Sequence, residues 1–132
     1  MKLLRRILTL VAILWAGWAV IAIVTPRWLV ESAMGQPPLG EAVWVRIAGV
    51  LGLVVALLCA LVSQRLEDVW WWSWAFAALE VGIATVALLQ ALFGLPDGAA
   101  AWPWWVAGGL SAVLAAAMFL GMADAGHEKP FV

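Results

Sequence analysis

Four unbroken apolar runs, each long enough to cross a lipid bilayer as a helix, constrain this chain more than any other feature of its sequence. They cover about residues 7–24, 43–62, 69–93 and 104–122. A spanning helix needs about 20 apolar residues to cross a hydrocarbon core of roughly 30 Å. A membrane β-barrel would instead alternate polar and apolar residues in segments of roughly ten. The sequence therefore predicts an all-α bundle of four transmembrane helices in a single domain, residues 1–132.

The overall composition indicates the same class of protein. Hydrophobic residues make up 67% of the chain and charged residues 11%, which leaves too little polar surface for a water-soluble domain. The formal net charge of -1 gives no indication of a nucleic-acid or acidic partner. Cys59 is the single cysteine, so no disulfide framework is predicted. We therefore expect the lipid bilayer as the main partner and no nucleic acid.

The first apolar run follows Lys2, Arg5 and Arg6, a pattern that also begins cleaved signal peptides. The run is too long for an ordinary signal core, contains Trp15 and Trp18, and lacks a clear cleavage site of small residues. We therefore expect this run to be retained as the first span.

Basic residues near the ends of the spans indicate the orientation of the chain, because cytoplasmic loops are enriched in lysine and arginine. If the N-terminus lies inside the cell, the outer side carries Arg27 and Arg46. The inner side then carries the larger group, which consists of Lys2, Arg5, Arg6, Arg65 and Lys129. This asymmetry predicts a multi-pass protein with both termini inside the cell.

The connection between the first two spans, residues 25–42, is the longest. Thr25 and Pro26 resemble a helix cap followed by a first-turn proline. The segment 27–31 is predicted to form about two turns of interfacial helix before Gly35, after which the chain turns back.

Most of the 11 tryptophans are predicted to lie at the two membrane interfaces, where an indole is half buried and its N–H reaches water or headgroups. Three of them are consecutive, so on a helix they point about 100° apart and cannot converge on one ligand. The predicted inner belt contains Trp70, Trp71, Trp72 and Trp74, and the outer belt contains Trp102, Trp104 and Trp105, joined by Trp28 and Trp44.

Trp15 and Trp18 differ from the other tryptophans because they lie deeper in the first span, on one side of the helix. They are candidates for lining a slot that takes a flat or long apolar ligand, such as a quinone, an isoprenoid or a pigment. The alternatives are packing against a neighbouring helix or lipid, and insertion into a larger complex.

Glu80 is the most informative residue of the sequence. It lies about ten residues, or roughly 15 Å, from the inner end of the third span, near the bilayer midplane. An ionised carboxylate at that depth is unfavourable by roughly a few kcal/mol or more, so the side chain must face protein or water, or be protonated. Small residues at alternating spacings of three and four predict that its face of the helix packs closely; they are Ser73, Ala77, Ala84, Ala87 and Ala91.

The second span carries a similar seam, with Arg46 near its outer end and Ala42, Gly49, Leu53, Ala56 and Ala60. Consecutive spans joined by a short loop are usually neighbours, so the two seams are expected to face each other. Arg46 would then lie roughly 9 Å nearer the outer surface than Glu80, a gap that extended side chains or one water can bridge. The two residues are a predicted intramembrane polar pair. The alternative for Arg46 is to extend outward into the headgroups.

A buried pair of this kind has two interpretations. It is a structural clamp between helices, or it is a site for a proton, an ion or a polar headgroup. Ser73 and Gln90 are further polar side chains that are candidates for lining such a site. No chain of acids or histidines continues from Glu80, so a transport path is not predicted.

No motif indicates a catalytic, metal or cofactor site. His127 is the single histidine and lies in the C-terminal tail, so a haem or metal held by histidines within a monomeric bundle is excluded. No serine has a histidine or lysine placed by sequence to activate it, and a glycine-rich phosphate loop is absent. We expect no cofactor and no enzymatic activity; the alternative is chemistry carried by Glu80 alone.

One stretch of the chain resembles a known family. Pro26 closes the first span, Gly35 and residues 36–38 follow, and residues 43–51 read Val-Trp-Val-Arg-Ile-Ala-Gly-Val-Leu. This order resembles small four-helix bacterial membrane proteins of the DoxX-like kind, in which a Trp-x-Arg-x-x-Gly element opens the second helix. The resemblance covers about half of the chain. It implies a bacterial inner-membrane bundle and no particular activity.

Two functions are compatible with these features. The leading hypothesis is a non-enzymatic protein that acts through helix contacts, as an accessory subunit of a membrane complex or as a self-associating bundle, because small-residue seams occur on several helices. The alternative is a binder or carrier of a small apolar or amphipathic molecule, such as a lipid, a quinone or an isoprenoid. Trp15 and Trp18 would form its walls, and Arg46 and Glu80 would anchor it.

Overall fold

The computed structural model describes residues 1–129, which form helices and connecting turns without any strand. The helices are α1 (Lys2–Val24), α2 (Val43–Gln64), α3 (Leu66–Val69), α4 (Ser73–Leu89) and α5 (Trp102–Glu128). A 3₁₀ turn at Trp70–Trp72 joins α3 to α4, and a π-helical turn at Gln90–Gly94 extends α4. Leu66–Gly94 is therefore one continuous helical segment.

Four of these segments are long and apolar enough to cross a membrane, so the predicted fold class is confirmed. Each predicted span lies within one of them. The first and last helices extend beyond the apolar runs, since α1 begins at Lys2 and α5 ends at Glu128. The added residues include Leu, Arg, Ala and Glu, which favour helix and let it continue past the apolar region. The orientation of the chain stays a prediction.

A short helical turn follows α1, as predicted for the first loop. Its hydrogen bonds span five residues instead of the four of an α-helix. This π-helical turn, η1, covers Trp28–Ala33. The amide of Met34 donates to the carbonyl oxygen of Leu29 at 3.0 Å. Gly35 ends the turn with a φ of 61°, a left-handed conformation that glycine adopts without steric cost.

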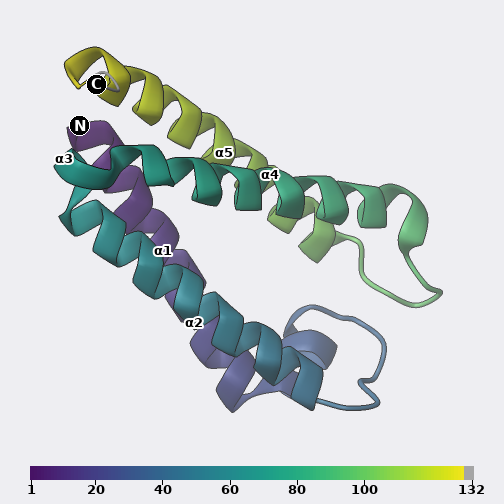
Figure 1. The fold of residues 1–132 in the computed structure, drawn as a ribbon. Helices are drawn as coiled ribbons and strands as arrows, with labels where there is room; N and C mark the ends of the chain where they lie inside the picture. The colour runs from purple at the N-terminus through teal and green to yellow at the C-terminus, as the bar shows by residue number, and fades with distance from the viewer. Residues whose placement is uncertain (130–132) are drawn as a thin grey trace.

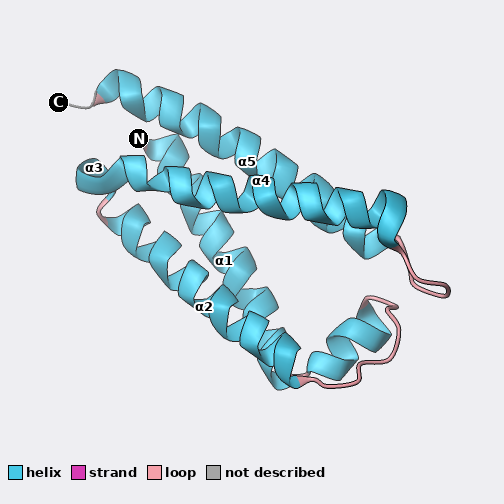
Figure 2. Cartoon of the chain, turned by 45° about the vertical axis from the view of Figure 1, so that its right-hand side comes forward, coloured by secondary structure: helices cyan, strands magenta, loops and turns pink. Residues whose placement is uncertain are grey.

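The helices form two antiparallel hairpins, α1 with α2 and α4 with α5 (Figure 1). α1 also packs on α5 and so joins the hairpins. The hairpins converge at one end, the closed end, which carries the N-terminus and α3, and diverge toward the opposite end, the open end, which carries the first loop and the loop between α4 and α5 (Figure 1 and Figure 2). The expectation that the second and third spans are packed neighbours is wrong. α2 packs on α1 and meets the third segment near the turn that joins them.

The closed end contains fully buried apolar side chains from three helices. Leu4, Leu8, Leu66 and Met118 are fully buried there. At the surface of this end, the Lys129 ammonium lies 3.8 Å from a carboxylate oxygen of Glu67. These contacts bring together α1, α3 and the end of α5.

Glycines on α2 allow the backbones of α1 and α2 to approach closely. A Cβ atom added at Gly49 would lie 3.0 Å from the Ala19 carbonyl oxygen and 3.2 Å from the Ala22 methyl group. A Cβ atom at Gly52 would lie 3.2 Å from the Trp15 ring. The small-residue seam of α2 therefore packs on α1, as expected for close helix contacts in a membrane.

The seam of α4 packs on a different helix. Ala77, Ala84 and Ala87 are buried, and α4 packs chiefly on α5. The two seams were expected to face each other, but each packs within its own hairpin.

We expect the substitution Gly49→Ala to lower the free energy of unfolding by about 1–3 kcal/mol, because the added methyl group meets a backbone oxygen of α1. Gly17→Ala is the matched control, since a Cβ atom there has no neighbour within 4 Å and alanine favours the helix. Unfolding in mixed micelles with increasing sodium dodecyl sulfate, followed by circular dichroism, measures both variants. A Gly49→Ala variant as stable as the wild type would contradict the close contact.

Candidate functional site

A cavity of about 600 Å³ lies between the two hairpins toward the open end. α1, α4 and α5 line it, together with the first loop and the start of α2. Its volume lies within the range of roughly 300–1,000 Å³ that is typical of small-molecule sites. Most of its lining is apolar, and four tryptophans belong to it: Trp15, Trp18, Trp44 and Trp104.

Glu80 lines this cavity from α4 and is 2% exposed. The Trp15 indole N–H donates a hydrogen bond to Glu80 Oε1, with 2.9 Å between the nitrogen and the oxygen. Ala77 and Ala84 are buried on the same helix face, so the glutamate points away from the lipid. The cross-helix partner of the glutamate is therefore a neutral indole of α1.

Arg46 does not pair with Glu80, because α2 packs beside α1 instead of α4. The Arg46 side chain is exposed, and its Nε donates to the carbonyl oxygen of Ile23 at 3.1 Å. Ile23 belongs to the last turn of α1, where carbonyl groups lack intrahelical partners and a positive charge is favourable. Arg46 thus caps α1. No ion pair joins it to Glu80 within residues 1–129.

Trp15 and Trp18 occupy the same wall of the cavity. Their ring centroids lie 5.8 Å apart and their planes make an angle of 82°, an edge-to-face arrangement that aromatic pairs favour. Both rings also pack over Gly52 of α2. The two tryptophans therefore contribute to the α1–α2 contact and to the cavity wall together.

Ser73 and Gln90 lie away from the cavity lining. Ser73 is fully buried at the start of α4, and its hydroxyl makes no hydrogen bond within residues 1–129. Gln90 lies in the π-helical turn that extends α4, where its Nε2 donates to the carbonyl oxygen of Gly94 at 2.8 Å. The structure therefore does not bring these two side chains to Glu80.

The predicted interface tryptophans divide into exposed and inward-facing residues. Trp70 is buried in the core of the closed end, and Trp104 lines the cavity. These two differ from the belt prediction because sequence spacing does not tell which helix face is covered. The remaining predicted belt residues are about half exposed or more, and they are Trp28, Trp44, Trp71, Trp72, Trp74, Trp102 and Trp105, of which Trp44 also lines the cavity.

The first loop covers the cavity and ties the two hairpins together at the open end. Gln36, which lines the cavity, donates from Nε2 to the carbonyl oxygens of Met34 at 2.8 Å and Ala100 at 3.0 Å. Its Oε1 accepts a hydrogen bond from the Trp104 indole at 3.1 Å. The Ala100 amide also donates to the carbonyl oxygen of Gly35 at 2.9 Å. Gln36 therefore links the first loop to the start of α5.

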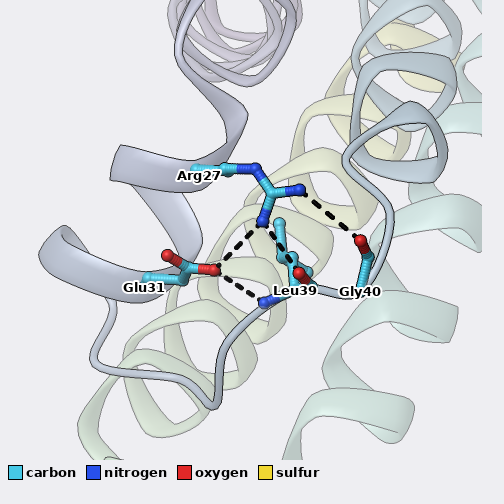
Figure 3. Close-up of polar contacts among 4 residues, drawn as sticks. All are labelled: Arg27, Glu31, Leu39 and Gly40. Atoms are coloured by element: carbon cyan, nitrogen blue, oxygen red, sulfur yellow. Dashed lines mark hydrogen bonds and ion pairs between the residues drawn. The ribbon is translucent and has the colours of Figure 1, made fainter.

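Arg27 and Glu31 hold the returning part of this loop against η1 (Figure 3). Arg27 Nη1 donates to the Leu39 carbonyl oxygen at 2.8 Å and lies 3.5 Å from Glu31 Oε1. The same carboxylate oxygen accepts a hydrogen bond from the Leu39 amide at 2.7 Å. This pair fixes the path of the chain above the cavity.

Sequence reasoning missed the polar lining residues Gln36 and Ser111, as well as the role of Trp104. A usable signal for Ser111 is the row of small residues Gly108, Ser111 and Ala115, which repeats at helical spacing and is buried. Gln36 carries no comparable signal, because its partners Ala100 and Trp104 lie on a distant part of the chain.

These features define a multi-pass helical membrane protein with a cavity between two hairpins. No protein-family model, curated protein or solved structure matches the chain. The resemblance to DoxX-like proteins therefore stays a prediction.

We expect the substitution Trp15→Phe to lower the free energy of unfolding by about 1–3 kcal/mol more than Trp18→Phe does, because it removes the N–H donor of a buried carboxyl group. Both variants lose the same volume from neighbouring rings, so the difference reports on the hydrogen bond to Glu80. Sodium dodecyl sulfate titrations of the two purified variants provide the comparison. Equal losses of stability would show that this hydrogen bond contributes nothing.

Proposed function

We propose that this protein is a non-enzymatic membrane protein that binds a small, largely apolar molecule in the cavity between its hairpins, with Glu80 as the polar anchor. The observation that carries the proposal is a buried carboxyl group in the lining of a cavity of about 600 Å³ whose other lining residues are mostly apolar. An apolar cavity with a few polar groups is the usual form of a small-molecule site.

The contacts of Glu80 favour a ligand site over a structural clamp. A clamp joins the glutamate to a basic residue on another helix, which offsets the cost of burying its charge. Within residues 1–129, Glu80 has no such partner, and the hydrogen bond that it accepts comes from the neutral indole of Trp15. Arg46, which was expected to share the anchoring role, binds the end of α1 instead.

The exposed lining residues of the cavity support entry from the bilayer. Leu14, Trp44 and Leu110 line the cavity and are each more than a third exposed. In a membrane, such apolar surface faces acyl chains, so an apolar molecule reaches the cavity without crossing water. The protein would therefore take its ligand from the lipid phase.

Filling the cavity tests this proposal. We expect Ala107→Phe, on the α5 side of the lining, to reduce the amount of co-purifying small molecule by about tenfold or more, because a ring placed in the cavity excludes the ligand. Ala112→Phe is the matched control, since Ala112 is exposed on the same helix. Mass spectrometry of organic extracts from the purified proteins gives the molar ratio of bound molecule to protein. The same bound molecule at equal ratios in all three proteins would contradict the proposal.

A second candidate function is association with another membrane subunit or with a second copy of the chain. A groove of about 770 Å³ along α1 and α2 favours it, because small residues that allow close helix contact line this groove. They are Ala12, Ala16, Ala56 and Ala60. The mass of the protein in mild detergent tests this candidate. A complex or an oligomer is expected, and a monomer with no co-purifying protein would contradict it.

A further inference from the structure

We infer that the ligand of the cavity is a lipophilic organic cation, an amine or a quaternary onium ion with an aromatic or aliphatic body. This inference rests on the proposed function and specifies the ligand class of the same site. It follows from the juxtaposition of one buried carboxyl group and four tryptophan rings around a single cavity.

The charge of the lining residues favours a ligand that carries a positive charge. Glu80 is the one ionisable side chain in the lining as described, and neither lysine, arginine nor histidine belongs to it. Two basic residues near the open end are bound elsewhere: Arg27 to the first loop and Arg46 to Ile23 of α1. An ionised Glu80 therefore lacks a counter-charge from the described chain, and a cation in the cavity supplies it.

The aromatic lining selects the chemical character of that cation. Tryptophan is the side chain whose ring face attracts cations most strongly, and quaternary ammonium groups are recognised by clusters of such rings. Trp15 contributes both a ring next to the cavity and the hydrogen bond that holds Glu80 Oε1. Trp18, Trp44 and Trp104 line the same space. A cation with an apolar body contacts these rings while its charge lies near the carboxylate.

Other ligand classes fit this lining less well. An anion is repelled by Glu80 and finds no basic partner in the lining. A metal ion such as Mg²⁺ or Ca²⁺ takes about six or more oxygen ligands, whereas residues 1–129 contain no cluster of three metal-binding side chains. A neutral molecule with a hydroxyl donor would hydrogen-bond to Glu80 and leave an ionised carboxylate without a counter-charge. The organic cation satisfies both the carboxylate and the rings.

The test uses three probes of similar shape and different charge: the cation tetraphenylphosphonium, the anion tetraphenylborate and the neutral donor triphenylmethanol. Saturable binding to the full chain is measured in phosphatidylcholine nanodiscs by equilibrium dialysis, with empty nanodiscs subtracted. The variants are Glu80→Gln, which keeps the shape and an acceptor for Trp15, and Glu41→Gln, which removes the same charge at an exposed position. Circular dichroism and elution volume verify that both variants fold.

We expect wild type to bind tetraphenylphosphonium at least about tenfold more tightly than either other probe, and Glu80→Gln to lose at least about tenfold in affinity for the cation. Glu41→Gln is expected to bind like the wild type. Tetraphenylborate or triphenylmethanol binding to wild type as tightly as the cation would overturn the inference, and so would equal cation affinity in wild type and Glu80→Gln. The probe comparison in wild type decides the matter even if Glu80→Gln fails to fold.

The outcome is separable from that of the proposed function. If a neutral molecule co-purifies with wild type and is lost in Ala107→Phe while no cation binds, the cavity is a ligand site and the inferred charge is wrong. If no probe binds and no molecule co-purifies, both the proposed function and this inference fail.

Discussion

The close contact of α2 with α1 at Gly49 and Gly52 determines where the other helices lie. Because no side chain separates the backbones at these positions, α2 lies against α1 and diverges from α4 along its length. The third segment and α5 then form a hairpin of their own, which packs on α1. The core is therefore continuous at the closed end, while the diverging hairpins leave a cavity toward the open end. Trp15 belongs to both regions, since its ring packs over Gly52 and its N–H reaches Glu80.

The first loop connects the two hairpins at the open end. Its hydrogen bonds through Gln36 and Gly35 reach the start of α5, and the pair Arg27 and Glu31 holds the loop against η1. Gly35 suits this place for two reasons, because its φ of 61° is left-handed and because a Cβ atom would lie 3.0 Å from the Ala100 methyl group. The loop is thus both the cover of the cavity and the connection between the hairpins on that side.

The burial of Glu80 connects the fold to the proposed function. A carboxyl group in a low-dielectric region is stable when partners satisfy it, and the indole of Trp15 satisfies one of its two oxygens. A cation in the cavity would add the missing counter-charge, and a ligand that binds the folded state alone stabilises that state by mass action. Under the proposed function, the residue that is costly to bury in the empty bundle would also give the cavity its selectivity. Ligand binding and folding stability would then be coupled through this one side chain.

The amino-acid sequence by itself determined the four spans, the helical turn after Pro26 and the burial of Glu80. These properties depend on the length of apolar runs, on local turn residues and on the cost of a charge at depth, all of which are local. Tertiary structure decided the partners. Similar small-residue seams on α2 and α4 gave no indication that one packs on α1 and the other on α5, so Arg46 was assigned to Glu80 in place of Trp15. For the same reason, the sequence did not predict that Trp70 and Trp104 face inward, or which residues Gln36 contacts. Which helix covers a given face depends on how well two whole helix surfaces fit each other. The sequence of one helix does not specify which other helix provides that surface.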